Sequence, residues 1–270
     1  MACINRIEGI STLSLNGQIQ GDIYSHCWFY ESARHSFEYE GYGAICGGIT
    51  GIALTAFMLE SYLNLCCKRI FDVESRVTEI LDDMPSDFFN VIDEITPEGL
   101  NINEKVSLAY GFKGQLDSLK KALESTLSVS KREKFIRLSV DKSFYEIDDK
   151  LRFSPKAKFF ALSETLYEDD NLKKQHRDIV EELFELRNSL AHGRSEFVQN
   201  SFSVTSPEIL RITPDLIPML QAGWQEKCSL VNAKKAFSHS CEIILLLSSK
   251  AFKEEYPFLM PTQLGSITQG

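Results

Sequence analysis

Two residue types suited to binding an anion and moving a proton lie close together near position 190. The segment Arg187-Asn188-Ser189-Leu190-Ala191-His192-Gly193 holds an arginine and a histidine, with an amide directly after the arginine. A planar guanidinium can donate two parallel hydrogen bonds to a phosphate or carboxylate. An imidazole, whose ordinary pKa is about 6.5, exchanges a proton near neutral pH. This segment is therefore our first candidate for a functional site.

The periodicity before Arg187 predicts a long amphipathic helix. At about 100° per residue, one apolar seam is formed by Leu172, Ile179, Leu183, Leu186 and Leu190. A solvent-exposed face on the other side carries Asp178, Glu181, Glu182, Glu185 and Ser189. A second apolar patch consists of Val180, Phe184 and Ala191. Arg187 lies between the two apolar stripes and not among the acids, which is informative because an unpaired charge there would be costly.

Arg187 therefore needs a carboxylate or a bound anion as its partner. Asn188 and His192 border the same patch, and Gly193 is expected to end the helix in the left-handed conformation. On one helix, His192 diverges from Arg187 by about 140°, which is too far for both side chains to contact the same substrate atom easily. If the helix packs against its symmetry mate, each arginine can face the histidine of the other chain. The alternative is a salt bridge from Arg187 to Glu60, with His192 as a cation at the helix end.

A long buried helix is predicted from about residue 43 to 81. Residues 41–59 carry no charge and nearly reach the length of a membrane span, although glycines and threonines dilute the stretch and Glu60 follows. We therefore expect a buried helix and no stable membrane insertion. A strip of small residues, Gly43, Gly47, Gly51 and Thr55, would serve a tight internal packing or a dimer seam. Glu60 and Asn64 share a face one turn apart, as hydrogen-bonded core groups or as the floor of a site.

The remaining elements are mostly helical by pattern. Asn16-Gly17 between alternating residues predicts a small β-hairpin over residues 12–24. Ser154-Pro155 is a good start for a helix to about Tyr167, and acids at 168–170 precede the key helix. Further predictions are an aromatic-rich helix to about 39, a short acidic helix or loop between Pro85 and Pro97, a helix over 104–127, short strands within 197–212, a short helix from Thr213, and a last helix over 228–253. Residues 131–153 give no clear pattern.

Composition limits the class of protein. The chain has 270 residues and a net charge of −9, so no broad basic surface marks it as a sequence-independent nucleic-acid binder. Seven cysteines without any C-x-x-C pair indicate buried thiols in a reducing compartment, and the start has no apolar signal region. The other histidines are scattered, so we expect no metal or other cofactor. These features predict a cytoplasmic location.

Leu186 to Gly193 resembles the signature motif of the HEPN superfamily, an arginine, a polar residue and a histidine at the end of a helix. The upstream run 178–185 resembles the same helix of that family, and Leu59 to Asn64 resembles the polar positions of its first core helix. The resemblance implies an all-α fold, here a HEPN-like helical bundle with small β-hairpin embellishments. It fits a single domain over residues 1–270, with core helices at about 43–81, 155–192 and 228–253 and an insertion at about 82–153.

The resemblance further implies a homodimer that cleaves RNA without a metal ion. Arg187 and His192 would be catalytic with Asn188, and Glu60 and Asn64 would support Arg187. His192 would move a proton while Arg187 holds the scissile phosphate, giving a 2′,3′-cyclic phosphate and a 5′-hydroxyl. Many such domains act as toxins or anti-phage defence effectors, so a cognate antitoxin or regulatory protein is a further expected partner. The alternative is a non-catalytic HEPN-like module that dimerises and acts through a partner protein or nucleotide.

Overall fold

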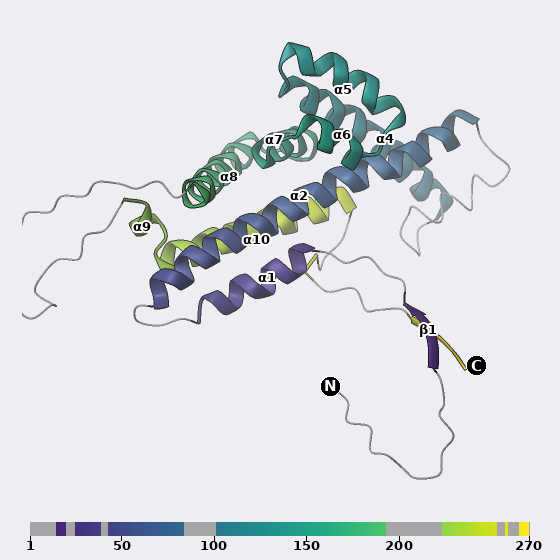
Figure 1. Ribbon diagram of the computed structural model, residues 1–270. Helices are drawn as coiled ribbons and strands as arrows, with labels where there is room; N and C mark the ends of the chain where they lie inside the picture. The colour runs from purple at the N-terminus through teal and green to yellow at the C-terminus, as the bar shows by residue number, and fades with distance from the viewer. Residues whose placement is uncertain are drawn as a thin grey trace, which may run out of the picture.

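The computed structural model describes residues 15–19, 25–38, 43–83, 101–192, 223–252, 257–258 and 265–269. The buried core of this part of the chain consists of helices, as the sequence predicted (Figure 1). The elements are β1 (Leu15–Ile19), α1 (Ser25–Ser36), α2 (Gly43–Asp83), α4 (Ile102–Ser125), α5 (Val129–Asp141), α6 (Phe144–Leu151), α7 (Pro155–Leu166), α8 (Asp170–Ala191), α9 (Gly223–Lys227), α10 (Leu230–Phe252) and β2 (Gly265–Gln269).

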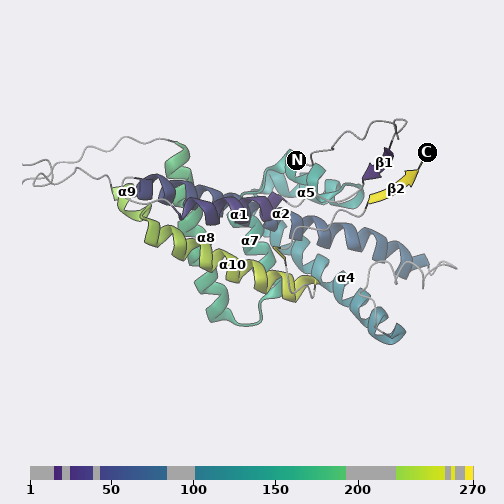
Figure 2. The ribbon, with the colours of Figure 1, turned by 90° about the horizontal axis from the view of Figure 1, so that it is seen from below.

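Helix α2 is the element on which the other core helices pack. It has 41 residues, which corresponds to about 60 Å at 1.5 Å per residue. Helices α1 and α10 lie along it, and α4, α6, α7 and α8 contact it as well (Figures 1 and 2). Helix α8 is seen almost end-on in Figure 1, where α2 runs across the view, so the two helices cross steeply. The predicted long buried helix is confirmed.

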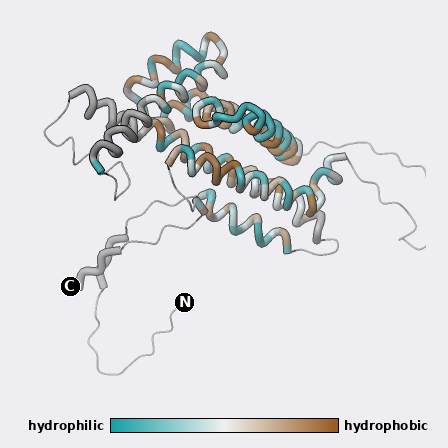
Figure 3. Tube along the Cα trace, turned by 180° about the vertical axis from the view of Figure 1, so that it is seen from behind, coloured by the Kyte–Doolittle hydropathy of each residue, from teal (hydrophilic) through white to brown (hydrophobic). Residues whose placement is uncertain are grey.

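The middle of α2 also passes a simple test for a membrane span. Within the described residues, its segment Cys46–Phe71 is long and apolar enough to cross a bilayer, and half of that stretch is buried inside the structure. Hydropathy colouring shows its brown positions beside the neighbouring helices (Figure 3). Much of this apolar surface is thus already covered by other helices of the same chain.

Two glycines let α2 approach its neighbours closely. A Cβ atom at Gly51 would lie 2.5 Å from the ring of Phe37, just after α1. One at Gly48 would lie 2.0 Å from the backbone oxygen of Cys228, between α9 and α10. Thr55, one turn after Gly51, is fully buried. The small-residue strip was predicted to serve either internal packing or a dimer seam. Its members Gly51 and Thr55 serve internal packing.

The segment predicted as an insertion is part of the core in its described portion. Helix α4 packs against α2 and α7, and α5 packs against α4 and α6. Phe144 and Ile147 of α6 are fully buried, and the Phe144 ring lies 5.3 Å from that of Phe71 on α2. Helices α5 and α6, which were not among the predicted elements, therefore extend the hydrophobic core of the bundle.

The starts of α7 and α8 follow the predicted capping signals. The hydroxyl of Ser154 accepts a hydrogen bond from the backbone N–H of Ala157 at 3.1 Å, and Pro155 occupies the first turn. A carboxylate oxygen of Asp169 accepts from the N–H groups of Asn171 and Leu172 at 2.8 and 3.1 Å. These caps satisfy donors that the helix itself leaves without partners. They fix where α8, which carries the candidate site, begins.

The predicted hairpin at Asn16-Gly17 is wrong. Both residues lie inside strand β1, which pairs antiparallel with β2 near the other end of the chain, Asn16 opposite Thr268. The local turn signal was thus overridden by a non-local pairing. The predictions for Pro85 to Pro97, the strands within 197–212, the short helix from Thr213 and the cap at Gly193 lie outside the described residues.

Candidate functional site

Arg187 is held by an ion pair with Glu60. Its Nη2 atom donates to Oε2 of Glu60 at 2.5 Å, which joins α8 to the middle of α2. The side chains are 26% and 28% exposed, so the pair lies at the edge of the core. Val180 and Phe184 of α8 are buried beside it. The predicted need of Arg187 for a carboxylate is met by the residue that the sequence had placed on the facing helix.

Two further contacts fix the plane of the guanidinium. Nη1 donates to Oδ1 of Asn188 at 3.0 Å. The Cζ atom lies 5.4 Å from the ring centroid of Phe57 and 6.0 Å from that of Phe184, within the range of cation–π attraction. Phe57 is 39% exposed and lies one turn before Glu60 on α2. The sequence analysis missed Phe57, although its spacing from Glu60 places both on one face.

His192 is the C-cap of α8 and is exposed. Its backbone N–H donates to the carbonyl of Asn188 at 3.0 Å, and its φ of −87° is right-handed. Among the described residues, its imidazole makes no hydrogen bond or ion pair. It is five positions after Arg187, which means a rise of about 7.5 Å and a turn of about 140° along the helix. The structure therefore brings Arg187, Asn188 and Glu60 together and leaves the imidazole apart from them.

Asn64 does not reach Arg187. Its Oδ1 accepts a hydrogen bond from Nζ of Lys158 at 2.7 Å, and Lys158 also pairs with Asp148 at 2.6 Å. Lys158 is only 3% exposed, so this is a buried polar cluster that joins α2, α6 and α7. The sequence analysis did not identify Lys158, whose position inside the apolar run of α7 was the available signal. Of the two predicted supports for Arg187, Glu60 contacts it and Asn64 does not.

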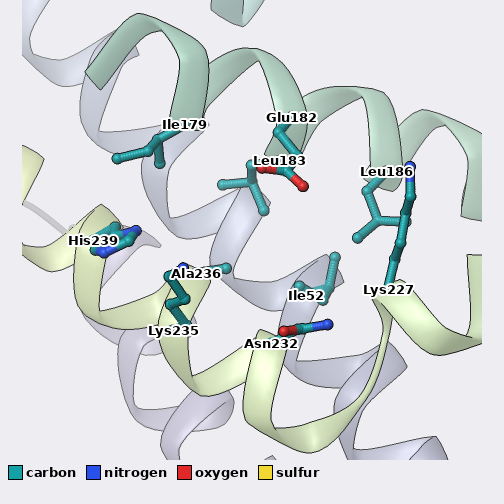
Figure 4. Close-up of a pocket in the computed structure, with 10 residues that line it drawn as sticks. All are labelled: Ile52, Ile179, Glu182, Leu183, Leu186, Lys227, Asn232, Lys235, Ala236 and His239. Carbon is teal, nitrogen blue, oxygen red and sulfur yellow. The ribbon is translucent and has the colours of Figure 1, made fainter. Parts of the chain in front are cut away.

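A cavity lies on the side of α8 that faces α10. It has a volume of about 210 Å³, and its wall includes Ile179, Glu182, Leu183 and Leu186 of α8 (Figure 4). Ile52, Lys227, Asn232, Lys235, Ala236 and His239 complete the lining. Arg187, Asn188 and His192 do not line it. The cavity and the motif thus occupy different faces of one helix.

Comparisons with protein-family models, curated proteins and solved structures found no match. The HEPN resemblance therefore depends on the motif residues and on the helix that carries them. Within the described part of the chain, no three histidine, cysteine, aspartate or glutamate side chains are grouped so that they could hold a metal ion.

Proposed function

We propose that the protein is an endoribonuclease that cleaves RNA by attack of the 2′-hydroxyl, with a site made by the motifs of two chains. The observation that carries the proposal is that Arg187 is both oriented by its neighbours and partly exposed. Glu60 and Asn188 orient the guanidinium at 2.5 and 3.0 Å, yet about a quarter of the side chain remains exposed. Guanidinium has five N–H donors, and the described residues accept from two of its nitrogens. The group is thus held in position with donors left for a phosphate.

The chemistry requires the two motif residues in different roles. Imidazole of His192 takes the proton of the 2′-hydroxyl, whose oxygen forms a bond to phosphorus. The bond from phosphorus to the 5′-oxygen breaks, and that oxygen leaves with a proton taken from water. The products are a 2′,3′-cyclic phosphate and a 5′-hydroxyl. Arg187 stabilises the added negative charge on the phosphoryl oxygens through its oriented N–H groups. Proton transfer of this kind typically accelerates a reaction by about 10²–10⁴.

The separation of Arg187 and His192 on α8 explains why two chains are needed. Within one helix the two side chains diverge by about 140°. Packing of the C-terminal end of α8 against a second copy would bring each Arg187 near the other chain's His192. The exposure of His192 and Asn188 leaves this end of α8 accessible for such packing.

The test is cleavage of purified total RNA by the purified protein in the presence of EDTA, with mapping of the new ends. We expect cyclic phosphates and 5′-hydroxyls from the wild type and loss of cleavage in the Arg187→Ala, His192→Ala double variant. The matched control is Arg34→Ala, His35→Ala. These residues are an exposed arginine and histidine on α1 that form ion pairs with the nearby Glu31 and Glu38. Equal cleavage by the wild type and the motif variant would refute the proposal.

One observation favours the non-catalytic alternative. The charge of Arg187 is already balanced by Glu60, so the pair can also act as a clamp between α8 and α2 in a module that binds a partner protein or nucleotide. Mixing motif variants separates the two functions. A chain with Arg187→Ala and a chain with His192→Ala can rebuild one intact composite site in a mixed dimer. Recovery of cleavage on mixing supports catalysis across the interface, whereas a binding module recovers none.

A further inference from the structure

We propose that the cavity between α8 and α10 binds a small organic anion made of an apolar ring or chain and an anionic head group. This site is separate from the motif of Arg187, and the proposal does not depend on RNA cleavage. Three features carry it: the volume of the cavity, the division of its lining into apolar and cationic parts, and two lysines that form no ion pair with a carboxylate of the described residues.

The cavity has an apolar floor. Ile52 of α2 and Leu183 of α8 are 2% and 3% exposed and belong to its lining. Ile179, Leu186 and Ala236 extend this apolar surface between the two helices (Figure 4). The volume of about 210 Å³ exceeds the space of a few water molecules, at about 30 Å³ each. An apolar group is favoured there because water on such a surface has few hydrogen-bond partners.

The rim of the cavity carries the charged groups. Asn232, Lys235 and His239 come from successive turns of α10, and Lys227 ends α9 and extends beside Leu186 (Figure 4). Spacings of three and four residues keep the α10 groups on one helix face. The rim therefore places two ammonium groups, an amide and an imidazole above one apolar floor. An anionic head can reach these donors while its apolar body lies below.

Some cations near α8 are paired with carboxylates, and within the described part of the chain the rim lysines are not. Lys156 pairs with Glu181 and Glu185, while Arg177 pairs with Glu164. Lys227 and Lys235, in contrast, make no ion pair with any described carboxylate, although the protein has a net charge of −9. Glu182 is the only carboxylate in the lining, and no ion pair joins it to either lysine. Its position fits a hydrogen-bond donor on the ligand, such as a hydroxyl or an amine.

Phenyl phosphate is a suitable probe because it joins an apolar ring to a phosphate, and phenol and inorganic phosphate represent its halves. We expect saturable binding of phenyl phosphate to the full chain in a ligand-observed NMR titration, with both halves at least tenfold weaker. Changing Lys227 and Lys235 to Gln should weaken binding about tenfold or more, as the loss of charge-assisted hydrogen bonds implies. Equal binding of inorganic phosphate would overturn the proposal.

The matched control is the Lys174→Gln, Lys234→Gln double variant. It removes the same charge from exposed positions on the same two long helices, α8 and α10, without touching the lining. Its affinity should stay within about twofold of wild type if contact and not overall charge governs binding. A third variant, Ala236→Phe, fills the cavity, and it should abolish binding while circular dichroism shows the helical fold unchanged. If Ala236→Phe still binds phenyl phosphate, or if the Lys174→Gln, Lys234→Gln variant loses as much affinity as the Lys227, Lys235 variant, the ligand binds elsewhere.

Discussion

The Nζ atom of Lys158 lies 2.6 Å from Oδ2 of Asp148 inside a core where Lys158 is 3% exposed. Asn64 accepts a second hydrogen bond from the same ammonium at 2.7 Å, and the ammonium lies 5.8 Å from the centre of the Phe144 ring. The charge is therefore satisfied by one residue from α6 and one from α2. This cluster links the 102–151 helices to the rest of the bundle.

Replacing Lys158 by methionine should destabilise the protein by about 3 kcal/mol or more, because it leaves Asp148 partly buried without its cation. Urea denaturation followed by circular dichroism measures this. The Lys158→Met, Asp148→Leu double variant should recover much of the loss, since two apolar side chains do not need each other. A single variant as stable as wild type would show that the pair contributes nothing to folding.

Replacing Glu60 by glutamine should reduce the proposed RNA cleavage more than it reduces the stability of the fold. The pair with Arg187 is about a quarter exposed, so its loss should cost no more than about 1 kcal/mol of stability. An amide holds a guanidinium less tightly than a carboxylate does. Cleavage in the EDTA assay should fall by about tenfold or more, because one misplaced catalytic group can have an effect of that size. A large loss of stability with full cleavage would instead assign the pair a purely structural role.

Two glycine-to-alanine changes should act in opposite directions. At Gly48 the new methyl group would meet the backbone oxygen of Cys228 at 2.0 Å, and a backbone cannot easily move aside. We expect a loss of about 2 kcal/mol or more from this overpacking. At Gly114, within α4, a Cβ meets nothing within 4 Å. Alanine there should stabilise the helix by about 0.5–1 kcal/mol. Thermal melting of both variants measures the two effects, and equal shifts of the melting temperature would contradict the prediction.

Stability should fall as the pH drops below the ordinary pKa of histidine, through His176. Burial lowers the pKa of this imidazole, whose Nδ1 lies 2.8 Å from the hydroxyl of Tyr167; nearby Glu242 raises that pKa and His239 lowers it. Burial also raises the pKa of the Tyr167 hydroxyl, which therefore stays protonated beside Nδ1. Above pH of about 6.5 both states hold a neutral histidine. Below it the unfolded chain gains a proton that the folded chain binds less readily, so unfolding is favoured.

Melting temperatures between pH 7.5 and 5 measure this dependence. In the His176→Gln variant the part of the slope due to this residue should disappear, while the fall caused by other groups remains. Replacing the exposed His35 by glutamine provides a matched substitution that leaves His176 in place. The same slope in His176→Gln and wild type would contradict the assignment.

The helices that the sequence predicted best are those marked by local signals. The caps at Ser154 and Asp169 fix α7 and α8 where they were expected, and the uncharged run at 41–59 predicted the buried α2. Such signals act within one or two turns, so they can be read from the chain alone. Helix α6 carries local signals that were not recognised in the sequence: Ser143 and Glu146 form a capping box at its start, and Phe144, Ile147 and Leu151 form a buried apolar stripe. Helix α5 begins after Ser128, whose side chain makes no capping hydrogen bond, so its start lacks that signal.

The candidate site was predictable where it depended on one helix. The apolar stripes of α8 showed that Arg187 needed a carboxylate, and Glu60 supplies it. The partner of Asn64 was not predictable, because Lys158 lies 94 residues further along the chain and only the tertiary fold brings them together. The turn expected at Asn16-Gly17 failed for the same reason, since its strand pairs with residues 265–269.

The 41-residue helix α2 carries Glu60, the floor residue Ile52 and Asn64 of the buried cluster on one continuous rod. Twelve residues from Ile52 to Asn64 (64 − 52 = 12) correspond to about 18 Å along the axis. Hydrogen bonds between successive turns fix these spacings along the axis. The cavity floor at Ile52 and the ion pair at Glu60 are therefore held about two turns apart. Helix α2 thus serves as a common scaffold that sets the distances between the cavity, the Arg187 pair and the buried cluster.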